Sequence, residues 1–452
     1  IQHRIGLDIK EIRSRIKDVS ERRDRYKVDL VPSKPVDRSI DNMRISALYR
    51  KATELVGAEE KSDDLEDEAK QLATMSFSHV RSLTVSTQAF QLMPNLSTFL
   101  VLRVLNLKKC VAVKNHHFKD ICIMFHLRYL SLNAKFITEI PREIQNLQFL
   151  QVLDISNAGR IENMPTIIHL RQLLCLCLKP QQDIRLPDGY GKLMSLQELT
   201  ITIKSPSMLC DLQCLTELRT LAINFCDWGE SYEEPFIQCL SNLVNLKSME
   251  INGTMMSSLC SERDKLYPGP QQICSIVMES HADTVIMTAV PRWMSSLCFL
   301  STINITLLTL GEPDIQVLGS IPSLSDLSIC VKETTQDRDG RLVIGKCYPF
   351  QCLTKMSINY SAMEVVFAPE GMQNLKELHL VFWVAEVMHK FGDCNLGLEH
   401  LSSLEHVSVQ IFEERSPFKE TVEDEIRKAI DMNPGKPTLL ISSSRTKWSR
   451  FG

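Results

Sequence analysis

Few residues in this sequence have the types and spacing that a catalytic or metal-binding site requires. His116-His117 and Cys122 are residue types that bind zinc, but no second pair of ligands at a usual spacing accompanies them. The acidic pairs Asp63-Asp64 and Asp67-Glu68 lack the apolar surroundings that would shift the pKa of a catalytic carboxyl. Gly345-Lys346 lacks the earlier glycine and the following Ser or Thr of a phosphate-binding loop. We therefore expect no enzyme activity, no metal and no bound cofactor.

The composition is typical of a folded protein rather than of a nucleic-acid-binding or membrane-spanning one. Apolar residues make up 44% and charged residues 23% of the 452 residues, a length too great for one ordinary compact core. The net charge is −4, whereas proteins that bind nucleic acid are usually basic. No uninterrupted apolar stretch reaches the roughly 18 residues of a membrane span. The sequence predicts several domains or an elongated repeat architecture.

The fifteen cysteines are scattered singly, often inside apolar runs, as Cys175 and Cys177 are. A secreted disulfide framework would show paired cysteines at regular spacing in a short chain. We therefore expect reduced cysteines that pack as small apolar residues in a cytoplasmic protein.

A leucine pattern, L-x-x-L-x-L, recurs along most of the chain. Copies begin at Val80, Leu102, Leu127, Leu150, Leu173, Leu196, Leu218, Leu246, Leu300, Leu324, Leu353, Leu375 and Leu404. Their middle positions lie 22 to 29 residues apart, except for one gap of 54 residues that would hold two longer units and a degraded copy at Cys274 to Val277. This spacing is typical of leucine-rich repeats. It predicts an α/β solenoid, a horseshoe of about 13 repeats, preceded by an N-terminal helical segment.

Each repeat would contribute a short strand whose apolar face is buried only when neighbouring repeats stack on it. Cys110 and Cys226 fall on the Asn/Cys position of the pattern and are expected to pack inside. Ile140-Pro141 predicts a turn that returns along the convex side. Trp228 and Trp383 follow strand patterns, and we consider them possible interface anchors near the edge of the concave face.

The two ends of the chain have patterns of their own. Residues 1–29 are predicted to form an amphipathic helix whose seam consists of Ile5, Ile9, Ile12, Ile16 and Val19. Little more than two heptads are present, which favours one helix of a bundle over an independent coiled coil. The repeats would occupy residues 76–415. Residues 416–452 would form a C-terminal cap and tail, with a short helix whose apolar stripe is Val422, Ile426, Ala429 and Ile430, and a final strand at Thr438 to Ile441.

These pieces, in this order, resemble plant coiled-coil, nucleotide-binding, leucine-rich-repeat (NLR) disease resistance proteins. The resemblance rests on residues 9–26, Leu55-Val56-Gly57, His79 to Leu83, Val290 to Met294 and Asn433 to Leu439. It implies that residues 1–29 are the remnant of a coiled-coil helical domain. It also implies that residues 30–75 are a linker and the truncated start of a nucleotide-binding domain.

The sequence departs from that family within the nucleotide-binding domain. Leu55, Val56 and Gly57 match positions that line the adenine pocket in such proteins, but no phosphate-binding loop follows them. The chain passes directly to the first repeat. The resemblance therefore implies a vestigial site without useful nucleotide affinity.

The resemblance also implies a function in plant innate immunity. Such repeats would recognise a pathogen effector or a guarded host protein, with no nucleic acid and no membrane span involved. An alternative is an adaptor or regulator that acts on a full-length receptor or a ubiquitin ligase, although residues 1–41 lack the helical motif that a ligase adaptor needs. A further alternative is an inactive truncated product.

Overall fold

The computed structural model describes residues 78–444, apart from 88–89, 91–92, 94, 100, 156–160, 162–163, 166, 179–185, 227, 254–269, 280–286, 335–339, 346–349, 370 and 413–416. The predicted helical seam (Ile5, Ile9, Ile12, Ile16 and Val19) and the Leu55-Val56-Gly57 segment lie outside the described residues. The domain boundaries predicted before residue 76 therefore stay predictions.

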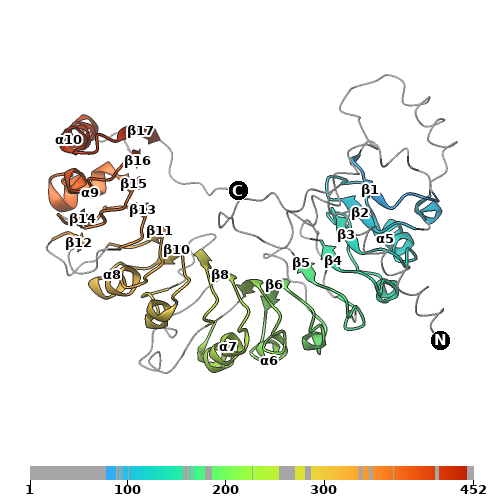
Figure 1. The fold of residues 1–452 in the computed structure, drawn as a ribbon. Helices are drawn as coiled ribbons and strands as arrows, with labels where there is room; N and C mark the ends of the chain where they lie inside the picture. The colour runs from blue at the N-terminus through green and yellow to red at the C-terminus, as the bar shows by residue number, and fades with distance from the viewer. Residues whose placement is uncertain are drawn as a thin grey trace, which may run out of the picture. The chain divides into compact units, whose positions relative to one another are not determined.

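In the part of the chain that the structure describes, fifteen short strands form one parallel sheet, and they pair in the order in which they occur in the chain (Figure 1). The strands are β1 (Ser82–Thr84), β2 (Val104–Leu107), β3 (Tyr129–Leu132), β4 (Val152–Asp154), β5 (Cys175–Cys177), β6 (Glu198–Ile203), β7 (Thr220–Phe225), β8 (Ser248–Gly253), β9 (Ser275–Glu279), β10 (Thr302–Leu307), β11 (Asp326–Val331), β13 (Lys355–Tyr360), β15 (Glu377–Trp383), β16 (His406–Phe412) and β17 (Thr438–Ser444). The pattern leucines align across the ladder, with Leu83 opposite Leu105 and Leu105 opposite Leu130. This register confirms the predicted α/β solenoid.

The sheet has two strands more than the thirteen copies of the pattern found in the sequence. β9 occupies the degraded copy, where Ile276 is fully buried and pairs with Met249 on one side and Ile303 on the other. The gap of 54 residues in the pattern therefore does hold two repeat units. β17 is the second additional strand and comes from the segment predicted as a cap.

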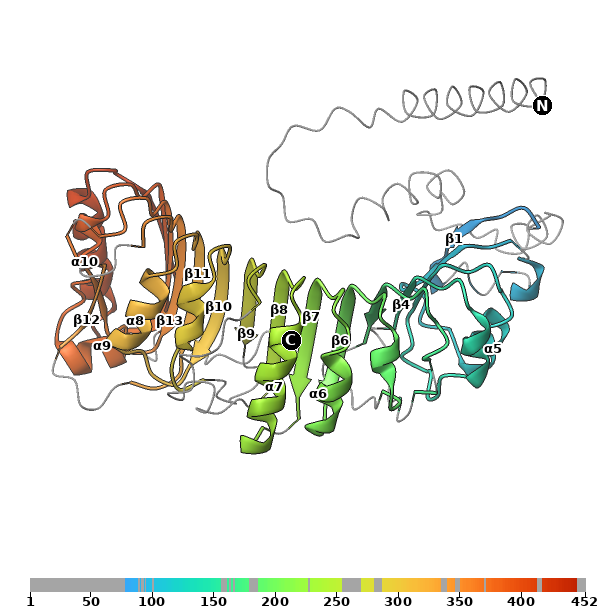
Figure 2. The same ribbon diagram turned by 60° about the horizontal axis from the view of Figure 1, so that its bottom comes forward.

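The helices and 3-10 turns of the described residues lie on one side of the sheet, which we call the helix face (Figure 2). The buried apolar side chains lie between them and the sheet. The described helices and 3-10 turns are α5 (Asn115–Ile121), α6 (Ser207–Leu212), α7 (Glu230–Asn242), α8 (Glu312–Gly319), α9 (Val384–Phe391), α10 (Lys419–Met432), η1 (Leu96–Thr98), η2 (Arg142–Asn146), η3 (Tyr190–Lys192), η6 (Arg292–Ser296) and η7 (Leu398–His400). Pro141 directly precedes η2 with φ −67°, a value that its ring imposes. The turn predicted at Ile140-Pro141 is thus confirmed.

A second, two-stranded parallel sheet consists of β12 (Leu342–Ile344) and β14 (Val365–Phe367). Gly345 follows β12 with φ +91°, and a Cβ added to Gly371 would lie only 2.9 Å from the Gly345 Cα. The two glycines therefore let two backbone segments approach each other. Close backbone packing therefore explains why residue 345 is a glycine, and no phosphate-binding role is needed to explain it.

The last repeat is closed by α10 and β17. Val422, Ile426 and Ile430 form the buried stripe of α10, as the sequence predicts. β17 pairs with β16 from Thr438 to Ser444, three residues further than the predicted strand. The cap is thus a final unit of the same solenoid rather than a separate layer.

The cysteines follow the prediction only in part. Cys110 is fully buried, as expected, but Cys226 is exposed. β7 extends to Phe225, whose ring fills the core at that point and leaves the next side chain outside. Of the thirteen cysteines in the described part of the chain, six are exposed (Cys210, Cys214, Cys226, Cys274, Cys298 and Cys352). The expectation that cysteines pack inside is wrong for these six.

Candidate functional site

The side of the fifteen-stranded sheet opposite the core, called the sheet face below, is the candidate binding surface. Side chains alternate along a strand, so Leu105 and Leu107 are buried while Asn106 and Lys108 point outward. The middle outward positions form a central row: Thr84, Asn106, Ser131, Asp154 and Cys177, and then Thr200, Ala222, Glu250, Val277, Asn304, Ser328, Ser357, His379, Ser408 and Leu440. Most of these side chains are short and polar, and none of them is Phe, Tyr or Trp. It therefore presents hydroxyl and amide groups at strand spacing, about 4.8 Å apart.

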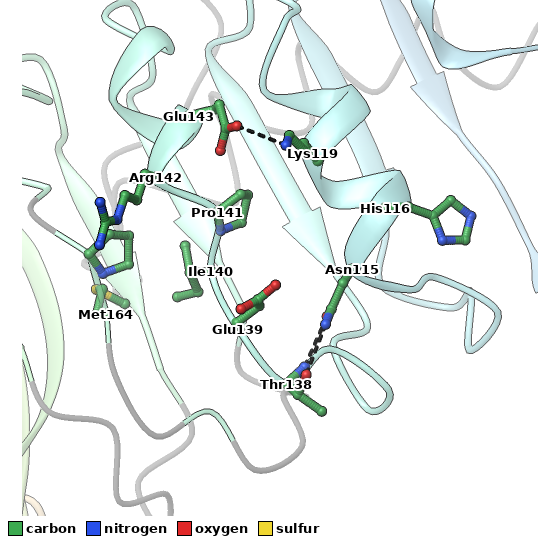
Figure 3. A pocket seen from close by; sticks show the side chains of 11 residues that line it. Asn115, His116, Lys119, Thr138, Glu139, Ile140, Pro141, Arg142, Glu143 and Met164 are labelled. Carbon is green, nitrogen blue, oxygen red and sulfur yellow. Dashed lines mark hydrogen bonds and ion pairs between the residues drawn. The ribbon is translucent and has the colours of Figure 1, made fainter.

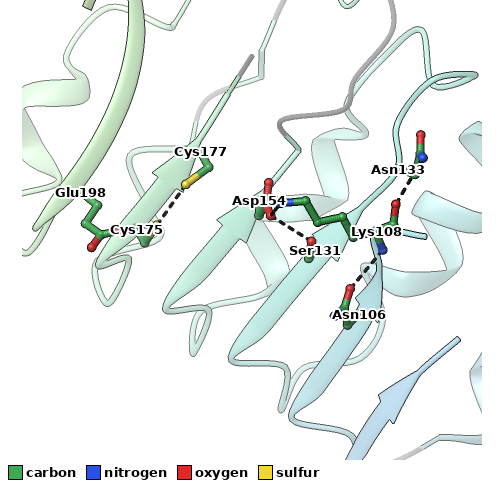
Figure 4. A network of polar contacts seen from close by, with 8 residues as sticks. All are labelled: Asn106, Lys108, Ser131, Asn133, Asp154, Cys175, Cys177 and Glu198. Carbon is green, nitrogen blue, oxygen red and sulfur yellow. Dashed lines mark hydrogen bonds and ion pairs between the residues drawn. The ribbon is translucent and has the colours of Figure 1, made fainter. Parts of the chain in front are cut away.

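Three side chains from neighbouring strands meet on the sheet face near its N-terminal end (Figure 4). Asp154 is only 8% exposed, and its carboxylate accepts hydrogen bonds from Lys108 Nζ and Ser131 Oγ, both at 3.0 Å. Half of the Lys108 side chain stays exposed. The repeat pattern does not single out this cluster, although Ser131 and Asp154 occupy the same position of successive repeats.

Two cysteines lie beside this cluster on the short strand β5. The Sγ atoms of Cys175 and Cys177 are 3.3 Å apart, and Cys175 Sγ lies 3.4 Å from Glu198 Oε2 on β6. Cys175 is buried and Cys177 is half-buried. Buried Leu176 between them points into the core, so both thiols lie on the sheet face.

Ion pairs line the C-terminal part of the sheet where its strands begin. Lys355 Nζ lies 2.8 Å from Glu377 Oε2, and Lys376 Nζ lies 2.7 Å from Glu405 Oε1. The hydrogen bond to Glu377 raises the pKa of Lys355, and the hydrogen bond from Lys376 lowers the pKa of Glu405. All four side chains are about half exposed, so they are accessible to a partner of complementary charge.

The two tryptophans predicted as interface anchors have different surroundings. Trp228 is 4% exposed and packs edge-to-face against Phe225 and Phe236, with ring centroids 4.7 and 5.6 Å apart. Its prediction as an exposed anchor is wrong, because the chain turns after β7 toward α7 and carries the indole into the core. Trp383 ends β15, is half-buried and stacks on Phe412 at 4.9 Å. Its role as an anchor stays a prediction.

His116 and His117 lie on α5, on the helix face. His117 Nδ1 accepts a hydrogen bond from the Lys114 backbone N–H at 3.1 Å, so its Nε2 carries the proton and donates to His116 Nε2 at 3.0 Å. Burial and the charge of His116 lower the pKa of His117. Within the described residues, no group of three or more His, Cys, Asp or Glu side chains is placed to hold a metal ion.

A hollow of about 700 Å³ lies on the helix face between α5 and η2 (Figure 3). Its lining includes His116 and the charged residues Lys119, Glu139, Arg142 and Glu143. Lys119 Nζ and Glu143 Oε1 form an ion pair at 3.1 Å, and the His116 ring points away from these charged groups (Figure 3). Because charges of both signs are mixed, the hollow favours no ligand class.

The chain is similar to known proteins over most of its length. The model of the leucine-rich repeat region family matches residues 79–439. Disease resistance protein RGA5 of Oryza sativa subsp. japonica is 28% identical over 387 residues, which cover 77% of this chain and 32% of that protein. Disease resistance protein Pik-2 of the same rice is 21% identical over 424 residues, which cover 81% of this chain and 40% of that protein. The chain thus spans less than half the length of these relatives.

A solved leucine-rich-repeat protein of Leptospira interrogans has 18% sequence identity and a TM-score of 0.44, and the match covers 84% of this chain and 100% of that chain. No helix among the described residues has the length and apolar character that a membrane crossing requires. The repeat register, the continuous parallel sheet and the match over residues 79–439 show that the chain belongs to the leucine-rich repeat region family.

Proposed function

We propose that the chain is a cytoplasmic plant defence protein without enzymatic activity, whose sheet face recognises another protein. The partner is a pathogen effector or a host protein that an effector modifies. The observation that carries this proposal is the alignment of about four fifths of the chain with rice disease resistance proteins. The family model matches residues 79–439, which include every strand of the sheet face up to β16.

The chemistry of the sheet face fits a protein partner. Its central row offers short hydroxyl and amide side chains, which bind backbone and polar groups without steric obstruction by long side chains. Paired charges such as Lys355 and Glu377 complement a partner of mixed charge rather than a polyanion. Trp383 stacks on Phe412, and tryptophan is one of the residue types enriched at the energetic centres of interfaces.

The experiment is a binary interaction screen of the full chain against secreted pathogen proteins, host proteins and full-length receptors of the same family. Ser328→Arg and Ser357→Arg place long charged side chains in the centre of the row, where the two serines pair directly. We expect each to weaken binding of a true partner at least tenfold, because the bulk blocks close approach.

Ser295→Arg is the matched control, since Ser295 is exposed on η6 of the helix face. It should leave binding unchanged. A partner that binds both sheet-face variants normally but no longer binds Ser295→Arg would overturn the assignment of the surface. Binding to full-length receptors alone would instead support the alternative, a regulator that acts in trans.

A further inference from the structure

The sulfur atoms of Cys175 and Cys177 lie closer together than the packing of the repeats requires. The two residues project from the same side of β5, and their sulfur atoms are in contact at 3.3 Å (Figure 4). Alternate residues of a strand have Cα atoms about 6.6 Å apart, close to the upper end of the separation that a disulfide spans, about 6.8 Å. The two sulfur atoms need to approach by a little over 1 Å to reach a bond length of about 2.05 Å.

β5 is weakly paired on the side of β6, which lets it bend for that approach. It is three residues long and pairs with β6 at two positions only, Cys175 with Glu198 and Leu176 with Leu199, so Cys177 is paired on one side alone, with Asp154 of β4. β6 and β7, by contrast, pair at six positions. A small bend at Cys177 therefore breaks few backbone hydrogen bonds.

We propose that Cys175 and Cys177 are a dithiol modification site that a low-molecular-weight disulfide, such as oxidised glutathione, converts reversibly to an intrastrand disulfide. The half-buried Cys177 thiolate attacks one sulfur of oxidised glutathione and releases one glutathione thiolate. Cys175 then gives up its proton to solvent, attacks the Cys177 sulfur and releases the second glutathione. Two protein thiols become one disulfide, and one glutathione disulfide becomes two thiols.

The order of attack follows from the surroundings of the two thiols. Cys175 is buried and its sulfur lies 3.4 Å from Glu198 Oε2, whereas Cys177 is half-buried, so Cys177 is the thiol that a dissolved disulfide reaches first. Cys177 pairs in register with Asp154, which binds Lys108 and Ser131. Oxidation therefore changes the sheet face directly beside its most connected polar cluster, whatever protein binds there.

The test uses the full chain, incubated with oxidised glutathione and then alkylated before digestion with trypsin. Residues 172–185 form one tryptic peptide that contains these two cysteines and no other, because Lys179 precedes Pro180 and resists cleavage. We expect neither cysteine of this peptide to be alkylated. Its mass should be lower by two hydrogens than that of the reduced, unalkylated peptide. Excess reduced glutathione should restore both sites. A peptide that stays doubly alkylated after oxidised glutathione overturns the proposal.

Three variants make the test specific. In Cys175→Ser, Cys177 should accumulate a stable adduct with glutathione, because the second thiol is missing, whereas the unmodified chain should show this adduct only transiently. An adduct equally stable in the unmodified chain would contradict the proposal. In Cys177→Ser, Cys175 should stay reduced, and it should react with the alkylating reagent only after the chain is unfolded. Cys214→Ser is the control: it removes one of two exposed cysteines on and after α6 and should leave the 172–185 disulfide unchanged.

Discussion

The side-chain amide nitrogen of Asn433 donates a hydrogen bond to the carbonyl oxygen of Leu398 at 2.7 Å, joining the end of α10 to the preceding repeat. A second bond from the same nitrogen reaches Leu401 O at 3.0 Å, and Asn433 Oδ1 accepts the Gly435 N–H at 2.8 Å. Asn433 is 1% exposed. One buried side chain thus satisfies three backbone groups at the point where the cap closes the solenoid.

Asn433→Ala should lower the free energy of unfolding by about 3 kcal/mol, because it leaves buried carbonyl and N–H groups without partners. Urea denaturation measures the loss, and faster amide hydrogen exchange in α10 would locate it at the cap. Asn374→Ala is the control: Asn374 Nδ2 donates to Gln351 O at 2.7 Å, but this bond is exposed to water. Equal losses for the two variants would contradict the capping role.

Gly253→Ala should destabilise the contact between β7 and β8. Gly253 ends β8 with φ +113°, and an added Cβ would lie 2.1 Å from Phe225 O on the paired strand. Backbone strain at such a φ costs about 1–3 kcal/mol, and the strands must also separate. Gly229→Ala is the control, because a Cβ added there would meet nothing within 4 Å and its φ is −151°. Thermal denaturation should show a marked loss for the first variant only.

Trp228→Ala and Trp383→Ala should differ in what they impair. Trp228 packs between β7 and α7, so truncation should lower the unfolding free energy by about 3–5 kcal/mol. Trp383 is half-buried, so its truncation should cost less stability and weaken partner binding more. Denaturation and the binding assay on both variants check this. A stability loss at Trp383 equal to that at Trp228, with binding intact, would assign both to the core.

Stability should fall as the pH drops below about 6.5, and His117 should contribute to this fall. Burial, followed by the charge of His116, lowers the pKa of His117 in the folded state. The unfolded chain therefore takes up a proton first, so the stabilisation present above pH 6.5 is lost as the pH falls through the folded pKa. His117→Asn keeps an acceptor for the Lys114 N–H and should show a shallower decline of the urea midpoint between pH 7.5 and 5.5. An unchanged decline would contradict this assignment.

Cys122 and Cys394 should resist alkylation by iodoacetamide at pH 8 in the folded chain. Burial raises the pKa of each thiol to about 12, so almost no thiolate is present. The exposed Cys210 and Cys298 should be alkylated readily under the same conditions. Peptide mapping with and without urea checks the difference. Labelling of Cys122 before unfolding would contradict the buried position of α5.

The sequence by itself determined the period of the solenoid and the inward side chains of almost every strand. Leu105 and Leu130 could be assigned to the core because strand alternation is local and the same spacing recurs in each repeat. The C-terminal helix stripe at Val422, Ile426 and Ile430 followed from helical periodicity for the same reason. Ile276 was harder to assign, because stacking on both neighbours holds its strand despite a poor local pattern.

Only the tertiary structure decided where side chains outside the pattern point and which of them meet. Trp228 and Trp383 both follow strands, yet the path of the next crossover buries one and leaves the other half-buried. Lys108 and Asp154 are two repeats apart, and their contact depends on the register of three strands at once. Asn433 is polar and precedes a proline, so its local sequence indicates a turn, while its burial comes from carbonyl groups of another repeat. Local periodicity determines the side of a strand on which a residue lies, but contacts between repeats form only when the repeats stack.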